Sequence, residues 1–313
     1  MKRKASITVF ITLLVLFFAV FVMFYLHISR PTEKEKTERL NLGINKGSQT
    51  KFMKAEKQMQ KVKPVAAVLP DNRRDYAAEN NEIKALIVKL GSDDLNISLD
   101  AAQELYKLGK SAIPDLLEAL KQADIALKGQ IIFLLGRIGD KDAVPALVQI
   151  LADENAYIRR NAAEALGKIK NEGAISSLAT SLFDGDIAVR ERSAWALGEI
   201  RDARAVESLL DRMIDEKDGM VKTAAVISLG KIQDQRATQV LLRELKSQAN
   251  SLYKNEVVKS LGELKDPSAI KGLSEHLNLL KQYNPTEKLV IFQWQEAIKI
   301  TEEAISKIQN KSS

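Results

Sequence analysis

The chain has 313 residues, of which 45% are hydrophobic and 28% are charged, with 47 Lys and Arg against 41 Asp and Glu. It contains no cysteine, which excludes a disulfide framework, a cysteine-based zinc site, a thiol nucleophile and a lipid-modified lipoprotein cysteine. Residues 1–82 carry 15 basic and 8 acidic residues, so the rest holds 47 − 15 = 32 basic and 41 − 8 = 33 acidic residues. This near-neutral remainder argues against a nucleic-acid surface.

Residues 1–30 predict an N-terminal membrane anchor. Three basic residues at positions 2 to 4 precede the apolar run Ala5 to Ile28, whose 24 residues are enough to span a bilayer. No A-x-A-like pair of small residues follows the run, so an uncleaved anchor is favoured over a signal peptide. The crowded N-terminal charges favour a cytoplasmic N-terminus. We therefore expect a single-pass bacterial inner or plasma membrane protein whose repeat region is extracytoplasmic, in the periplasm.

Residues 31–80 have no sustained apolar periodicity and are rich in Lys, Glu, Gln and Asn, which is typical of a flexible polar and basic stalk. Within this stalk Phe52, Ala55, Met59 and Val62 fall at helical spacing opposite four lysines. That pattern predicts a short basic amphipathic helix. It is compatible either with binding to anionic lipid or a partner, or with a solvated linker.

Residues 81–309 predict an all-α, right-handed α-solenoid of about seven antiparallel helix pairs. A Leu-Gly step recurs with its glycines at 109, 136, 167, 198, 230 and 262, which are 27, 31, 31, 32 and 32 residues apart. No stretch alternates with the period of a strand. The expected pairs are 82–90 with 98–108, 113–121 with 126–138, 143–151 with 156–169, 174–182 with 187–200, 205–214 with 221–232, 237–246 with 253–264, and 268–280 with a terminal capping helix at 286–308.

The repeated Leu-Gly step lies in the second helix of each pair. Positions eight and four before the Leu and three after it are mostly apolar, which predicts the core face of that helix. A glycine inside a helix costs about 1 kcal/mol relative to Ala. Its recurrence at one position therefore indicates that a neighbouring helix approaches there, and a larger side chain at Gly167 should separate the layers.

The stretch from Val189-Arg190 to Arg201-Asp202, with its 31-residue period, resembles the HEAT repeat in its short bacterial, phycobilisome-lyase-type form. The resemblance covers about residues 82–280. It implies a structural ladder between layers, built from an Asp six residues before an Arg, which is matched by Asp153 with Arg159 and by Asp184 with Arg190.

Later layers depart from that ladder pattern. Lys222 and Lys254 occupy the Arg position, Asp215 is displaced by one residue, and Ala249 occupies the Asp position. We therefore expect the ladder to weaken towards the C-terminus.

Two enzymes share this architecture. Deoxyhypusine hydroxylase resembles a HEAT array that binds iron through His-Glu dipeptides, but this chain has only His27 and His276, and Glu275 precedes the latter. Bilin lyase subunits share the repeat, although nothing in it specifies a pigment. No triad, phosphate-binding loop or metal cluster is recognisable, so no catalytic, cofactor or metal residue is expected.

The remaining expectation is a binding surface. In this fold the second helices line a concave face, and the position two before the repeated Leu carries large apolar groups there. The candidate groove residues are Tyr106, Phe133, Arg160, Glu164, Trp195 and Ile227. Aromatic residues outside the core are typical of binding hot spots, whereas packing against the adjacent layer is the alternative interpretation.

Together these features predict a non-catalytic, membrane-anchored HEAT-repeat scaffold that binds a protein partner through its concave face. One alternative is an accessory or lyase-like subunit of an enzyme system. A second is a nucleic-acid-binding HEAT-like protein, which the neutral repeat region disfavours. No nucleic acid and no small-molecule substrate is expected as a partner.

Overall fold

The computed structural model describes residues 76–247, 251–283, 285 and 288–310. All of them belong to one compact unit, residues 52–313. The predicted anchor at 1–30, and the stalk up to residue 75 with its basic amphipathic segment, lie outside the described residues. Within the described part of the chain, no helix has both the length and the apolar character needed to cross a membrane.

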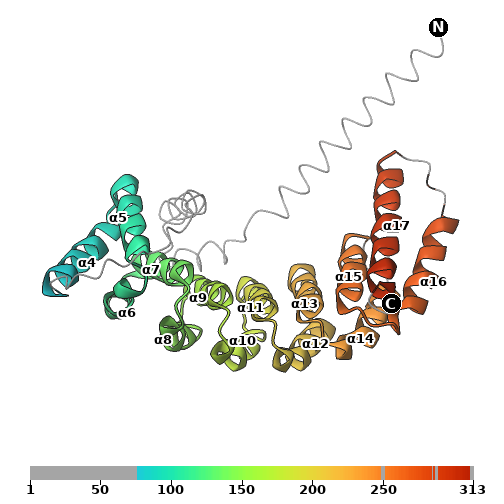
Figure 1. Cartoon of the computed structure of the whole chain (residues 1–313), viewed down its shortest axis with the longest axis horizontal. Coiled ribbons are helices and arrows are strands. Elements are labelled where there is room, and N and C mark those ends of the chain that lie inside the picture. Colours follow the sequence, from blue (N-terminus) through green and yellow to red (C-terminus); the bar gives the residue numbers. More distant parts are fainter. Residues whose placement is uncertain (1–75, 248–250, 284, 286–287, 311–313) are drawn as a thin grey trace, which may run out of the picture. The chain divides into compact units, whose positions relative to one another are not determined.

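The described residues form a stack of two-helix layers without a strand, and we call the two members of each layer the first and the second helix (Figure 1). The layers are α4 (Tyr76–Leu90) with α5 (Leu95–Leu108), α6 (Ile113–Leu120) with α7 (Ile125–Ile138), α8 (Val144–Ile150) with α9 (Ala156–Ile169), α10 (Ile175–Ser181) with α11 (Ile187–Ile200), α12 (Val206–Asp215) with α13 (Gly219–Ile232), α14 (Thr238–Leu245) with α15 (Ser251–Leu264), and α16 (Ala269–Gln282) with α17 (Lys288–Gln309). This is the helix-pair solenoid that the repeat predicts.

Helix starts are set by side-chain caps. Asp94, Asp124, Asn155, Asp186 and Asp218 each accept a backbone N–H from the first turn of the second helix that follows. The caps place the starts of α5 and α13 earlier than the predicted residues 98 and 221, so that Leu95 and Ile97 belong to α5 and Met220 belongs to α13. The first helix, α4, likewise begins at Tyr76 rather than at residue 82.

The ends of the second helices are formed by residues with positive φ, whose N–H returns to the repeated Leu carbonyl. Gly139 takes this role at the end of α7 with a φ of 76°. In the next three layers Lys170, Arg201 and Gln233 adopt φ values of 57°, 59° and 61°, and Lys265 follows with 51°. A positive φ is sterically unfavourable for an L-residue, whereas glycine adopts it without that penalty. Short 3-10 turns, such as η2 (Lys141–Ala143), then lead into the first helices.

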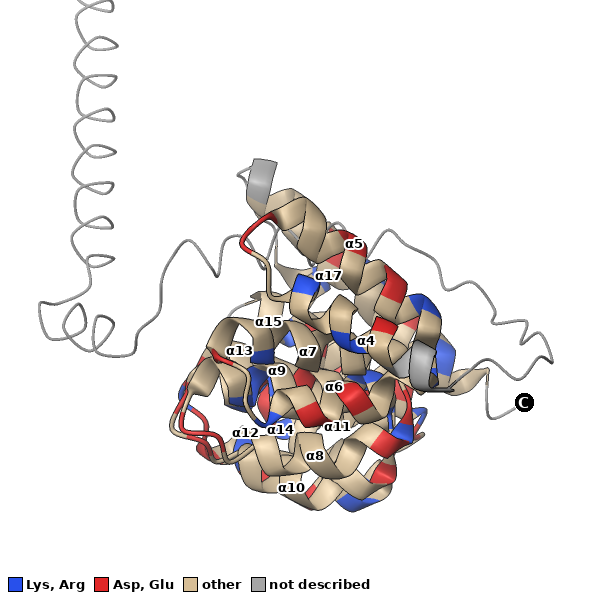
Figure 2. Cartoon of the chain, turned by 90° about the vertical axis from the view of Figure 1, so that its left-hand side faces the viewer, with Lys and Arg blue, Asp and Glu red and all other residues tan. Residues whose placement is uncertain are grey.

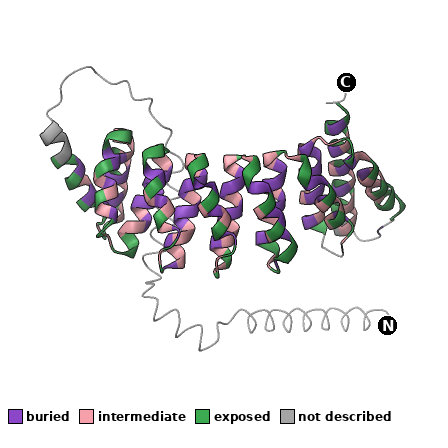
Figure 3. Ribbon diagram, turned by 90° about the horizontal axis from the view of Figure 1, so that it is seen from below, coloured by how far each residue is buried: buried purple, intermediate pink, exposed green. Residues whose placement is uncertain are grey.

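The core lies between the first and second helices and continues from layer to layer (Figure 3). The repeated leucines are central to it: Leu105, Leu135, Leu166, Leu197, Leu229 and Leu261 are fully buried, although the first of these lies three residues before the predicted Leu108. Gly109 ends α5 four residues after Leu105, as Gly139 ends α7 four residues after Leu135, so Leu108-Gly109 is not the internal Leu-Gly step of the other second helices.

Close contact between second helices occurs at the recurring glycine. A Cβ at Gly136, Gly167 or Gly198 would lie 2.8 Å from the Cα of Ala165, Ala196 or Ser228, respectively, in the next second helix. The same relation joins Gly230 to Ser260 and Gly262 to Ala304, at 2.9 Å. Each glycine thus meets a small residue, which directly precedes the next repeated Leu or, for Gly262, Ile305 of α17. This close approach explains why the position excludes a side chain.

The last helix follows the register of the other second helices. Ala304 takes the place opposite Gly262, and Ala297, Thr301 and Ile308 are buried at the spacing of the core positions. Its polar residues Lys299, Glu302 and Glu303 are exposed. α17 therefore closes the stack with a polar outer side, as a terminal repeat of a solenoid requires.

Candidate partner-binding face

The second helices present a face that turns away from the first helices, and we call it the inner face. Residues two before and two after the repeated Leu lie about 160° from it on an α-helix, since each residue turns about 100°. Because the Leu points into the core, these residues point to the opposite side, which is the inner side of the bend that the stack makes (Figure 1). Helix periodicity and the glycine contacts together place successive inner-face residues next to each other.

On the inner face, aromatic rings are paired with cations of the neighbouring layer. The Arg137 guanidinium lies 4.9 Å from the centroid of the Tyr106 ring, and the Lys168 ammonium lies 4.9 Å from that of Phe133. In both pairs the cation lies two residues after a repeated Leu. Phe133 lies two residues before the repeated Leu135, whereas Tyr106 directly follows Leu105. Tyr106 is half-buried, whereas Phe133 is only 8% exposed. A cation over a ring is worth about 0.5–2 kcal/mol.

Two further pairs lie within single helices. Arg160 lies 5.2 Å from the ring centroid of Tyr157 and donates hydrogen bonds of 3.0 and 3.3 Å to Asn161 Oδ1. Arg192 lies 5.7 Å from the ring centroid of Trp195. The Trp195 ring also packs against Gly167 of the preceding layer, so it contributes to interlayer packing while remaining half-buried at the inner face.

Glu164 is the acidic centre of this arrangement. Its carboxylate lies 2.8 Å from Lys168 Nζ and 3.9 Å from Arg192 Nε. Burial by itself would raise the pKa of Glu164, but the Lys168 hydrogen bond and the charges of Lys168, Arg192 and Arg160 outweigh it and hold this pKa below its ordinary value. Glu164 is therefore ionised and is surrounded by three cations, Lys168, Arg192 and Arg160.

The predicted groove residues thus fall into two groups. Tyr106, Phe133, Arg160, Glu164 and Trp195 lie on α5 to α11 and take part in the cation and ring contacts. Ile227 lies on α13 and is half-buried. The structure brings the first group together across adjacent layers, while Ile227 stands one layer further on.

Sequence reasoning did not include Tyr157, Asn161 or Arg192 in the groove. Tyr157 is nine residues and Asn161 five residues before Leu166, which places both on the inner face at 100° per residue. Arg192 holds the same position, five before Leu197. Adding the positions five and nine before the repeated Leu to the count would have found all three.

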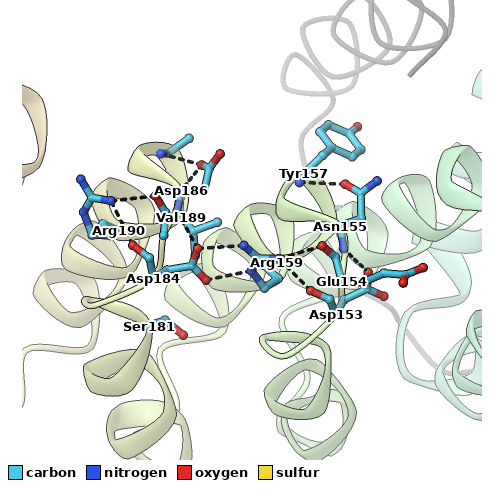
Figure 4. A network of polar contacts seen from close by, with 12 residues as sticks. Asp153, Glu154, Asn155, Tyr157, Arg159, Ser181, Asp184, Asp186, Val189 and Arg190 are labelled. Carbon is cyan, nitrogen blue, oxygen red and sulfur yellow. Dashed lines mark hydrogen bonds and ion pairs between the residues drawn. The ribbon is translucent and has the colours of Figure 1, made fainter. Parts of the chain in front are cut away.

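A ladder of ion pairs runs along the edge where the two helices of each layer are joined (Figure 4). Arg159 donates to both carboxylate oxygens of Asp184 at 2.8 Å, and to the backbone carbonyls of Asp153 and Glu154 at 2.8 and 3.0 Å. Arg190 likewise reaches the carbonyls of Asp184 and Gly185. Each Arg therefore bonds the backbone of its own turn and the carboxylate of the next layer.

The ladder continues through Lys128, Glu216 and Glu244, which the HEAT pattern did not indicate. Lys128 pairs with Asp153 at 3.2 Å, Arg190 pairs with Glu216 at 2.9 Å, and Lys222 pairs with Glu244 at 3.1 Å. Glu216 replaces the displaced Asp215, and Glu244 at the end of α14 replaces the missing acid at Ala249. The two lysine pairs have one contact each, whereas the two arginines bind through several nitrogens.

The described residues contain no group of three or more His, Asp or Glu arranged to hold a metal ion. A hollow of about 600 Å³ lies away from the inner face, where Val144, Pro145 and Val148 of α8 meet Asn171 and Gly173 of the next turn. Its walls carry no titratable pair apart from Lys141 and Asp142, and Lys110 already holds Asp142 at 2.8 Å.

The family model of HEAT repeats matches residues 113–184 and 180–261. The glycine contacts, the buried Leu column and the ladder fall in the same region. Residues 113–261 are HEAT repeats. Among curated proteins the sequence finds no match.

Several solved structures have a fold similar to that of this chain. Importin β is 19% identical over 83% of this chain and 40% of its own, with a TM-score of 0.52. The Escherichia coli protein YibA is 16% identical over 90% of this chain and 98% of its own, with a TM-score of 0.50. The CpcE and CpcF complex of phycocyanin lyase from Nostoc is 20% identical over 77% of this chain and 100% of its own, with a TM-score of 0.42. At these identities the likeness concerns the fold alone.

Proposed function

We propose that this HEAT-repeat protein is a membrane-anchored, non-catalytic scaffold that binds a protein partner through its inner face. The observation that carries the proposal is the row of ring and cation pairs on α5, α7, α9 and α11. Phe133 is buried in the core, whereas Tyr106, Tyr157 and Trp195 pack against the core and stay half-buried. Tyr, Trp and Arg are the residues most enriched at the centres of protein interfaces.

The charge of the row indicates the kind of partner. On the inner face of α7 and α9, the cations Arg137, Arg160 and Lys168 are accompanied by a single acid, Glu164. Lys168 is bound to Glu164, while both arginines lie against rings. An acidic segment with apolar or aromatic side chains would match this surface, because charge complementarity directs partner choice.

The binding test compares the native chain with a triple variant, Tyr106→Ala, Arg160→Ala and Trp195→Ala, by cross-linking and co-purification from membranes. Lys259→Ala is the matched control, since Lys259 is the exposed residue at the same helix position of α15. We expect a specific protein that the native chain and the control retain and the triple variant loses, while thermal melting shows the triple variant to be folded. Equal retention by a folded triple variant would contradict the inner face as the binding surface.

The membrane part of the proposal rests on the apolar run Ala5 to Ile28 and on the basic residues at positions 2 to 4. It is tested separately, because the chain has no cysteine of its own. In a Ser312→Cys variant, a membrane-impermeant thiol reagent should label intact cells if the repeats are extracytoplasmic. Protection until the cells are lysed would reverse the topology, and recovery in the soluble fraction would remove the anchor.

A further inference from the structure

Two arginines stand opposite each other on the inner face of α9 and α11. At the preceding junction, the position six before the repeated Leu of α7 meets the position five before the repeated Leu of α9, because a Cβ at Gly129 would lie 3.5 Å from Asn161 Nδ2. The recurring glycine contact has the same 2.8 Å spacing at both junctions, so both pairs of helices share one register. At the α9–α11 junction these two positions hold Arg160 and Arg192. Two like charges therefore face each other there.

Neither arginine is hydrogen-bonded to a carboxylate of the described residues. Arg160 donates to the neutral Asn161 Oδ1, at 3.0 and 3.3 Å, and its guanidinium lies against a tyrosine ring. The ion-pair distances of Arg192 are 3.6 Å to Glu191 and 3.9 Å to Glu164. Its Nε is buried without an acceptor in the described part of the chain. Since a guanidinium has five N–H donors, both groups can take a further acceptor.

The same two helices show how an arginine behaves when an acid is within reach. Arg159 donates to both oxygens of Asp184 at 2.8 Å. Arg190 donates to both oxygens of Glu216 at 2.9 and 3.3 Å. Such two-point bonds are typical of arginine with a carboxylate. The two inner-face arginines thus lack a partner that the arginines of the ladder have.

The inner face around these arginines has an excess of positive charge, although charged residues of both signs occur along the stack (Figure 2). The inner positions are those two, five, six and nine before and two after the repeated Leu. On α7, α9, α11 and α13 they hold five cations and three anions, a net charge of 5 − 3 = +2: Arg137, Arg160, Lys168, Arg192 and Lys231 against Glu164, Glu191 and Glu199. Lys168 binds Glu164 at 2.8 Å. Lys231 binds Glu199 at 2.6 Å. The excess therefore rests on the arginines.

We propose that Arg160 and Arg192 form a clamp that binds one carboxylate, carried by a Glu or Asp side chain of the partner. This assignment rests on the proposed inner-face binding and adds the chemical group that the face recognises. A carboxylate has about four lone-pair positions, so it can accept from both guanidinium groups at once. It would also lie between two like charges. A phosphoryl group is disfavoured, because Glu164 and Glu191 beside the clamp would repel its larger charge.

The probe is a fluorescein-labelled, amidated peptide of ten residues in which glutamates alternate with leucines. It is titrated with the full chain in detergent and followed by anisotropy. Leucines are included because the inner face also carries half-buried rings. A second peptide has glutamine in place of each glutamate, and a third has lysine. We expect the native chain to bind the glutamate peptide at least tenfold more tightly than either of the others, and less tightly as salt rises.

The test variant carries Arg160→Gln and Arg192→Gln and should bind the glutamate peptide at least tenfold more weakly than the native chain. The matched control carries Lys107→Gln and Lys231→Gln, which removes the same charge from inner-face lysines that are already paired with acids. It should bind within about threefold of the native chain. A third variant, Arg160→Glu with Arg192→Glu, should prefer the lysine peptide. Thermal melting checks that each variant is folded, and the glutamine pair decides if the reversed pair is not.

A fourth peptide has phosphoserine in place of each glutamate and should bind more weakly. Tighter binding of this peptide would overturn the clamp in favour of a phosphoryl site. Equal binding of the glutamate and glutamine peptides, unchanged binding by the test variant, or absence of binding would each overturn it as well.

The peptides need no cellular partner, so the two proposals can fail separately. A cellular partner that the native chain and the Arg160→Gln, Arg192→Gln variant retain equally would contradict the clamp alone. Clamp-dependent binding of the glutamate peptide, with no cellular protein retained by the inner face, would contradict the proposed function alone.

Discussion

The carboxylate of Glu216 lies 2.9 Å from Arg190 Nε of the preceding layer and 2.9 Å from Arg212 of its own first helix. It also accepts the backbone N–H groups of Lys217 and Asp218 at 2.9 Å. Its side chain is only 2% exposed, so one acid closes the α12–α13 turn and ties two layers together. Asp215 next to it is exposed.

Glu216→Gln should destabilise the chain by about 3 kcal/mol. Removal of one member of a buried ion pair leaves the other charges uncompensated, here Arg190 and Arg212. Chemical unfolding in urea measures the loss. Asp215→Asn is the matched control, which should change the free energy of unfolding by less than about 0.5 kcal/mol. Equal stabilities for the two variants would contradict a bridging role for Glu216.

Acid should weaken this bridge over a defined pH range. Burial alone would raise the pKa of Glu216, but hydrogen bonds from Arg190 and the Asp218 N–H, with the charges of Arg190 and Arg212, lower it to about 2 from the usual 4.5. Since the unfolded state takes up a proton first as pH falls, the stabilisation is complete above pH 4.5 and declines towards pH 2. The melting temperatures of the native chain and Glu216→Gln should therefore differ most near neutral pH and converge in acid.

Gly198→Ala should separate two layers, because the new Cβ would lie 2.8 Å from the Cα of Ser228. We expect a destabilisation of about 1–3 kcal/mol, the usual range for overpacking in a tight contact. Gly219→Ala is the matched variant at the first position of α13, where a Cβ meets nothing within 4 Å. It should stabilise the chain by about 0.5–1 kcal/mol through helix propensity. Melting curves of both variants check the opposite signs.

Arg201→Gly should stabilise the chain by about 0.5–1 kcal/mol. Arg201 ends α11 with a φ of 59°, a conformation that glycine adopts without the steric penalty of a side chain. The reverse exchange, Gly139→Lys at a φ of 76°, should destabilise the equivalent end of α7 by a similar amount. If Arg201→Gly lowered the melting temperature, the Arg201 side chain would have to make a contact that outweighs its backbone strain.

Much of the fold could be predicted because one helix position repeats. The period fixed the number and order of the layers, and the recurring glycine indicated a close approach. The partner of that glycine, such as Ser228 opposite Gly198, depends on how adjacent layers are rotated against each other, which helix periodicity within one layer does not determine. The ladder shows the same limit: Arg190 was placed correctly, but its carboxylate partner Glu216 belongs to the next layer.

The candidate site was predictable as positions and not as contacts. The count from the repeated Leu places Trp195 on the inner face, whereas the count that selected Tyr106 starts from Leu108 and not from the buried Leu105. Arg137 lies over the Tyr106 ring because of the way the two adjacent layers are placed against each other, which the position count within one helix does not give. Likewise, the sequence gives no sign that Trp195 packs against Gly167, because the two are 28 residues apart.

The ladder also makes the junctions between the central layers stiffer than the junctions on either side of them. In the middle, Arg159 and Arg190 each hold a carboxylate of the next layer and two carbonyls of their own turn. At the joints on either side, Lys128 and Lys222 make one ion pair each, and Lys222 also lies 5.9 Å from the centroid of the Tyr253 ring. A sideways load on the stack would therefore move α9, α11 and α13 as one stiff block and bend the joints with α7 and α15. A ligand that contacts both sides of a joint would bind a surface that can bend, whereas a ligand confined to the block would bind a rigid surface.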